Sequence, residues 1–336
     1  MGLFSDEPLK RGGGSNSNIP KKGRGPNRAQ LVRVTNKAPE VMVKITGYTK
    51  GSQHLGAHVD YIARDGELPL MTSEGQTLSG RDDLKAIQES WGKDLEPARQ
   101  KRKGGQSPVG RRSTRITTNL VLSIPKGDPN RLVDAAQGFA KTTFHNHDWV
   151  MALHTDTDHP HVHLTIRNLG HDGRRLNIPN GKVLDWREDF AESLREQGIE
   201  AEATRRAERG VTRKGDKQAI RHMRKRLTPR VDKQAVRQAT ERLAGKGKAE
   251  PWKDKILARQ HEMRGIWERV GQGLAKSPNP EDQALGKQAL EFRRNMPPVQ
   301  TRQDALMAAL ERHQIDAPNK ETDRNGGHEW DTEAQR

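Results

Sequence analysis

His154-Thr-Asp-Thr-Asp-His-Pro-His-Val-His-Leu-Thr-Ile-Arg-Asn168 is the stretch on which the fold and the chemistry of this chain depend. Its first ten residues hold four of the 13 histidines of the chain and two aspartates. The flanking segments, 149–153 and 161–167, are apolar and rich in β-branched residues, which is typical of strands. The sequence therefore predicts a hairpin in which two strands carry a histidine cluster.

Strand geometry places these histidines on one face. Side chains alternate along a strand, so His161 and His163 point one way and the apolar residues between and after them point the other way. Antiparallel pairing of the two strands brings His154 beside them. Three converging imidazoles suit a divalent cation that keeps positions open for a substrate. Asp156 is predicted to accept a ring N–H from one histidine and so fix its tautomer. A structural metal site, or hydrogen-bonded surface histidines, is the alternative.

The composition indicates an anionic partner. The formal net charge is +16, and the pI is about 10.1, which favours nucleic acid over a merely basic soluble protein. A hydrophobic fraction of 31% and a mean hydropathy of −1.00 are too polar for 336 residues of close-packed globule, so part of the chain is expected to be extended. The absence of cysteine excludes disulfides and thiolate zinc sites. We expect no membrane-spanning segment and no secretory leader.

Four regions are expected along the chain. Residues 1–38 read as a flexible basic arm, 39–213 as the folded catalytic domain, 214–317 as a helical basic region that binds DNA or a partner, and 318–336 as a disordered tail. Within the catalytic domain the patterns follow the order β α α β α β β α. We therefore predict an α+β fold with an antiparallel-centred sheet and helices packed on it.

A nucleophile is the next requirement, because three histidines holding a cation on a basic protein point to phosphodiester chemistry. The chain has two tyrosines. Tyr48 ends a strand beside Gly47 and is expected to be structural. Tyr61 lies near the end of a helix predicted from Ser52, off its apolar stripe. A phenol of pKa ~10 is only ~0.1% ionised at pH 7, a deficit of ~4 kcal/mol that a nearby metal or histidine can offset. Attack by tyrosine leaves a phosphotyrosine linkage, whereas attack by water gives hydrolysis, and residue spacing leaves both open.

Three motifs resemble those of conjugative relaxases. The pattern His154-x-Asp156-x-x-x-Pro160-His161-x-His163-x-x-x-Asn168 resembles their third motif, in the MOB-P branch of the HUH endonuclease superfamily, which includes the border endonuclease of T-DNA transfer. Residues 58–66 resemble the first motif, which carries a single catalytic tyrosine. Residues 117–127 resemble the second, whose serine contacts DNA near the cut. Residues 203–210 are also similar to the T-DNA enzyme.

The resemblance implies a specific reaction. Tyr61 would attack one phosphate at the nick site of a transfer origin and stay linked to the 5′ phosphate. His154, His161 and His163 would hold Mg²⁺ or Mn²⁺, with His154 as ligand or as base and Asp156 as its support. DNA contacts are expected from Arg64, Ser123, Lys126, Arg205, Arg206 and Arg209. The expected partners are single-stranded DNA, relaxosome accessory proteins and a type IV coupling protein, in the bacterial cytoplasm, with translocation into a recipient cell as a further expectation.

Three alternatives remain at this point. A rolling-circle replication initiator of the same superfamily uses the same chemistry. An accessory DNA-binding protein of the relaxosome would bind metal without catalysis. A metal phosphodiesterase would use water as the nucleophile. The sequence holds no GxxxxGK[ST] phosphate loop, so we expect another protein to separate the DNA strands.

Overall fold

The structure is a computed structural model that describes residues 26–95, 115–125, 127–157, 159–213, 215–247 and 250–316. Contacts divide the chain after Thr204 into two compact units. Much of the predicted basic arm, residues 96–114 and the predicted tail 318–336 lie outside the described residues. We describe each unit by itself.

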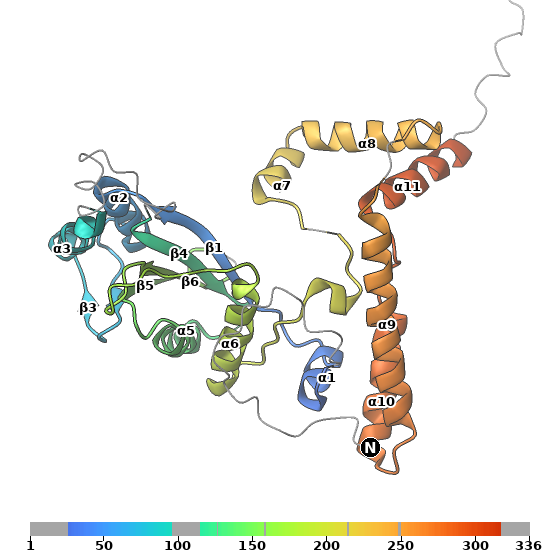
Figure 1. Ribbon diagram of the computed structural model, residues 1–336, viewed down its shortest axis with the longest axis horizontal. Helices are drawn as coiled ribbons and strands as arrows, with labels where there is room; N and C mark the ends of the chain where they lie inside the picture. Colours follow the sequence, from blue (N-terminus) through green and yellow to red (C-terminus); the bar gives the residue numbers. More distant parts are fainter. Residues whose placement is uncertain are drawn as a thin grey trace, which may run out of the picture. The chain divides into compact units, whose positions relative to one another are not determined.

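A six-stranded antiparallel sheet forms the centre of the first unit (Figure 1). Its strands lie in the order β1 (Met42–Thr49), β4 (Thr117–Ser123), β6 (His161–Arg167), β5 (Trp149–His154), β2 (Leu70–Thr72) and β3 (Thr77–Leu78). Every neighbouring pair is antiparallel. The two histidine-bearing strands, β5 and β6, are therefore central, and the predicted α+β fold is confirmed.

One face of the sheet is covered by two helices, α5 (Pro129–Thr143) and α6 (Lys182–Glu196) (Figure 1). Asp128 caps α5 by accepting a hydrogen bond from the Asn130 backbone N–H at 2.8 Å. The apolar side chains of β6 point to this face and are fully buried with those of the helices; they are Val162, Leu164 and Ile166. This packing supports the histidine hairpin on the face of the sheet opposite the histidines.

The opposite face carries α2 (Ser52–Ala63) and α3 (Arg81–Gly92), followed by a short 3-10 turn at Lys93–Leu95. Leu55, Val59 and Ile62 form the predicted apolar stripe of α2 and are fully buried. They pack with Val150 and Ala152, which are the residues of β5 on the same face as His154. The second core therefore fixes α2 beside the histidines.

Two features of this unit differ from the sequence-based expectation. The β2–β3 hairpin was not predicted, because strands of three and two residues show no measurable alternation. Residues 28–35 form helix α1 (Arg28–Thr35) within the stretch expected to be a flexible arm. Leu31 and Val34 are buried, and Arg33 pairs with Glu202 at 2.8 Å. Tertiary packing stabilises a helix that its composition does not favour.

The second unit is helical. It contains a 3-10 helix, η2 (Arg206–Arg209), and helices α7 (Gln218–Arg224), α8 (Arg230–Leu243), α9 (Lys253–Ala275), α10 (Pro280–Arg294) and α11 (Arg302–Asp316). The helical character expected of residues 214–317 is thus confirmed. Asp232 of α8 bonds Arg224 and Arg302 at 2.6 and 2.7 Å, which ties α8 to α7 and α11.

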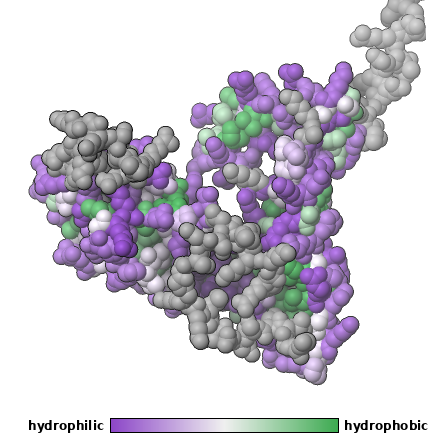
Figure 2. Space-filling view, in the orientation of Figure 1, coloured by the Kyte–Doolittle hydropathy of each residue, from purple (hydrophilic) through white to green (hydrophobic). Residues whose placement is uncertain are grey.

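The surface of the second unit is mostly hydrophilic, and one of its apolar areas lies over α7 and the start of α8 (Figure 2). Exposed Met223, Leu227 and Val231 belong to these segments. Among the described helices of both units, none combines the length and the apolar character needed to cross a membrane.

Candidate active site

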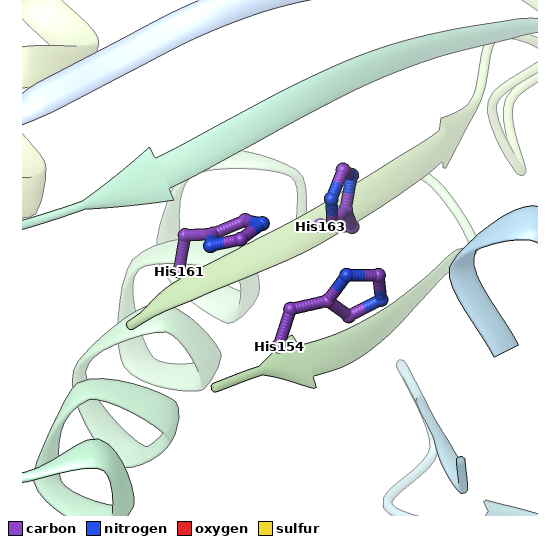
Figure 3. Close-up of side chains that lie close together, drawn as sticks. All are labelled: His154, His161 and His163. Atoms are coloured by element: carbon purple, nitrogen blue, oxygen red, sulfur yellow. The ribbon is translucent and has the colours of Figure 1, made fainter. Parts of the chain in front are cut away.

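The hairpin of β5 and β6 brings three histidines together on one face of the sheet (Figure 3). His154 pairs directly with His161, and Ala152 pairs with His163, so all three side chains lie on the same side. One ring nitrogen from each lies within 4.8 Å of the other two. The ring centroids are 4.4 to 5.3 Å apart. This is the arrangement that strand alternation predicts.

Hydrogen bonds determine which nitrogens of this cluster can bind a cation. His154 donates from Nε2 to the carbonyl oxygen of Ile62 at 2.8 Å, because a carbonyl can only accept. His161 donates from Nδ1 to the carbonyl of His159 at 3.2 Å. The lone pairs therefore remain on Nε2 of His161 and on Nδ1 of His154, and Nδ1 of His154 accepts a hydrogen bond from Nη2 of Arg64 at 3.3 Å. A backbone carbonyl behind a metal-binding imidazole is a common way of fixing its tautomer.

Burial favours the uncharged form of His154 and His163. His154 and His163 are only 2% and 8% exposed. Burial, followed by the neighbouring His154 and His161, lowers the pKa of His163 to about 3. Burial also lowers the pKa of His154, although the bond to Ile62 opposes this effect. Neutral imidazoles are the form that binds metal, so the donor set fits a divalent cation.

Tyr61 lies over this cluster from helix α2. Its ring centroid is 5.7 Å from that of His163, with the two rings perpendicular, and 6.3 Å from that of His154. The side chain is 55% exposed, because the buried stripe of α2 turns it toward the edge of the helix. Tyr48, by contrast, packs against Arg115, whose guanidinium carbon lies 3.6 Å from the ring centroid.

His58 connects the tyrosine helix to the sheet. Its Nε2 is hydrogen-bonded to Oγ1 of Thr165 at 2.8 Å, and Thr165 follows His163 on the same face of β6. Burial, with a smaller contribution from His54, lowers the pKa of His58 to about 4. The sequence alone gives His58 no role. The feature that indicates one is its position three residues before Tyr61, on the same side of one helix.

Arg64 and Asp156 form an ion pair at the edge of the cluster. Nη2 of Arg64 also lies 3.3 Å from Nδ1 of His154, and its guanidinium carbon is 5.5 Å from the Tyr61 ring centroid. Asp156 was predicted to bond a histidine. In the described part of the chain its side chain bonds Arg64 instead. Sequence spacing could not show this pairing, since the two residues are 92 positions apart.

The other expected DNA contacts are dispersed. Ser123 lies opposite His161 in the β4–β6 ladder, but it is 6% exposed and donates to the carbonyl of Pro160 at 3.2 Å. Arg205, Arg206 and Arg209 belong to the second unit, at and just before η2. Arg206 is exposed and donates to a backbone carbonyl at 3.3 Å. Lys126 lies outside the described residues.

Comparison with known proteins agrees with this geometry. Residues 76–199 match the family described as relaxase, MobA/VirD2-like, nuclease domain. Over these residues the first unit is therefore similar to relaxase nuclease domains. The matched span includes all three histidines, whereas Tyr61 lies upstream of it.

Curated relatives point the same way. The chain is 26% identical over 203 residues to the T-DNA border endonuclease VirD2 of Rhizobium radiobacter, a match that covers 56% of this chain and 45% of the relative. The VirD2 protein of Agrobacterium fabrum (strain C58) is also 26% identical over 203 residues, which is 56% of this chain and 42% of the relative. The VirD2 protein of Rhizobium rhizogenes is 26% identical over 200 residues, which is 55% of this chain and 43% of the relative. The match thus spans less than half of each relative.

Proposed function

We propose that this protein is a site- and strand-specific DNA nickase of the relaxase type that forms a covalent 5′-phosphotyrosine intermediate through Tyr61. The observation that carries the proposal is the position of the exposed Tyr61 ring, 5.7 Å from His163 and above the histidine cluster. A phenol placed there can reach a phosphate that is bound at the cluster. Tyr48 lies instead on β1, two strands from β6, with its ring against Arg115.

The reaction is a transesterification. The phenolic oxygen of Tyr61 forms a bond to phosphorus, and the bond from phosphorus to the 3′ oxygen breaks. The phenol gives up its proton and the departing 3′ oxygen takes one up, so no net proton is released. One phosphodiester is exchanged for another, which allows the strand to be joined again by the reverse reaction.

His154, His161 and His163 would hold Mg²⁺ or Mn²⁺ through the ring nitrogens that face one another. When bound, the ion withdraws charge from a phosphate oxygen, which stabilises the transition state by several kcal/mol. Other residues of the chain position the groups that react. Ile62 fixes the ring of His154 through its carbonyl, and His58 holds the tyrosine helix against β6.

The substrate we propose is single-stranded DNA at a transfer origin, because the curated relatives are T-DNA border endonucleases and the chain carries a net charge of +16. Relaxosome accessory proteins that melt the duplex and a type IV coupling protein are the partners we propose, with nicking in the bacterial cytoplasm. The basic region 214–317 would contribute further contacts to DNA or to these partners.

The two tyrosines of the chain provide a matched test. The full-length protein is incubated with Mn²⁺ and single-stranded oligonucleotides that tile the DNA next to its coding sequence, and a denaturing gel reveals adducts. Wild type and Tyr48→Phe should form a denaturant-resistant adduct, and Tyr61→Phe should form none. Cleavage without an adduct would indicate hydrolysis by water. Absence of both cleavage and adduct on every oligonucleotide would favour a DNA-binding protein without catalysis.

A further inference from the structure

Arg64 occupies a backbone position that disfavours it. It ends helix α2 at φ 51 and ψ 54, and Asp65 follows at φ 56. Both residues are in the left-handed region, where glycine is the usual residue because it lacks a Cβ. Side chains kept in such positions cluster at functional sites. The backbone position of Arg64 is therefore typical of a residue at a functional site.

The guanidinium of Arg64 lies close to both the proposed nucleophile and His154. It bonds Asp156, approaches Nδ1 of His154 at 3.3 Å, and lies 5.5 Å from the Tyr61 ring centroid. The side chain is also 36% exposed, so it faces the solvent from which a DNA strand would arrive.

Most donors of Arg64 remain available. Within the described part of the chain, its hydrogen bonds all come from Nη2, which leaves Nε and Nη1 without a protein partner. A guanidinium is permanently charged, and its planar donors match two oxygens of a phosphate. Arg64 can therefore keep its contact with Asp156 while it binds an anion.

Within the described residues, Asp156 makes no hydrogen bond to a histidine. The ring of His154 is already fixed by the carbonyl of Ile62, and His161 by the carbonyl of His159. The partner of the Asp156 carboxylate is the Arg64 guanidinium. A carboxylate in this place restricts where the guanidinium can point.

We propose that Arg64 binds the non-bridging oxygens of the phosphate that Tyr61 attacks, and that Asp156 is the positioning residue for Arg64. This inference rests on the proposed nicking function. It adds a fixed positive charge on the nucleophile side of the phosphate, where negative charge is redistributed as the phenolic oxygen bonds to phosphorus.

A phosphate-neutralisation experiment tests the contact without cleavage. Binding is measured in a Tyr61→Phe background, with an oligonucleotide cleaved by wild type whose scissile phosphate is replaced by an uncharged methylphosphonate. Neutralisation should weaken binding roughly tenfold or more when Arg64 is present. Arg64→Gly should bind normal DNA more weakly by a similar factor and should be insensitive to neutralisation. Equal sensitivity in both proteins would overturn the proposal.

Two controls separate this contact from a loss of structure. Arg64→Gly relieves the left-handed backbone, so its melting temperature should not fall below that of the parent. Arg174→Gln removes another arginine, which is 90% exposed and is paired with Asp172 at 3.9 Å, and it should retain full sensitivity to neutralisation. Sensitivity lost in Arg174→Gln as well would contradict a specific contact.

Asp156→Asn tests the positioning role. Because it removes a negative charge beside the DNA, KM should not rise, whereas kcat should fall at least tenfold, with partial recovery in Asp156→Glu. An unchanged kcat, or a loss confined to KM, would refute that role.

If no oligonucleotide is cleaved by wild type, methylphosphonates scanned along any bound strand still test Arg64. A failure of the nicking function is then distinguishable from a failure of this inference.

Discussion

Replacing His58 with glutamine should change how the stability of the protein depends on pH. The folded-state pKa of His58 is lowered to about 4, mainly by burial, whereas an imidazole in an unfolded chain titrates near 6.5. The unfolded state then binds more protons than the folded state between these values. Stability contributed by the neutral ring is complete above pH 6.5 and is lost as the pH falls toward about 4.

The magnitude follows from the same two values. Between pH 7.5 and pH 5, nearly one additional proton binds to the unfolded chain, so His58 should cost the wild type up to about 2 kcal/mol of unfolding free energy. Glutamine can still bond Oγ1 of Thr165 but carries no charge at any pH, so His58→Gln should escape this loss.

Urea unfolding at pH 7.5, 6.0 and 5.0, with EDTA present, measures this difference. The unfolding free energy of His58→Gln, relative to that of wild type, should rise by up to about 2 kcal/mol as the pH falls. His54→Gln is the matched control, because His54 is exposed on the same helix, and it should follow the wild type. Parallel pH profiles for wild type and His58→Gln would refute the assignment of His58 as a buried neutral anchor.

Three further predictions concern stability. Gly286→Ala should destabilise the α9–α10 pair by about 1–3 kcal/mol in chemical denaturation, because an added Cβ would lie 2.5 Å from the backbone nitrogen of Ala275. Arg167→Met should cost about 3–5 kcal/mol, since it leaves the carboxylate of Asp94, 3% exposed, without the guanidinium that bonds it at 2.7 Å; a wild-type melting temperature would contradict this. Trp267→Phe should cost about 1 kcal/mol by removing the Nε1–H donor to the backbone of η2 at 2.9 Å, and no change in urea midpoint would contradict it.

The hairpin was predictable because a period of two leaves little freedom. Antiparallel pairing of the strands at 149–153 and 161–167 places His154 beside His161 and His163. The apolar stripe of α2 likewise turned Tyr61 out of the core. These are local rules, and the structure agrees with them at each of these residues.

The remaining features depend on contacts that no local pattern encodes. The order of strands in the sheet and the β2–β3 hairpin arise from tertiary pairing. The bond from His154 to the carbonyl of Ile62 and the ion pair of Arg64 with Asp156 join segments about 90 positions apart. Residue spacing indicated that Asp156 belonged to the site, but it could not show that its partner is an arginine. The boundary expected at residue 213 stays a prediction; the contacts divide the chain after Thr204.

Identification of the residue that carries the DNA tests the central proposal most directly. The adduct formed by the wild-type protein with an oligonucleotide and Mn²⁺ is digested, and the modified peptide is sequenced by mass spectrometry. A nucleotide 5′ phosphate attached to Tyr61, in the peptide between Lys50 and Arg64, is the predicted result. Attachment to Tyr48 or to any histidine, or cleaved DNA with no modified peptide, would contradict the proposal.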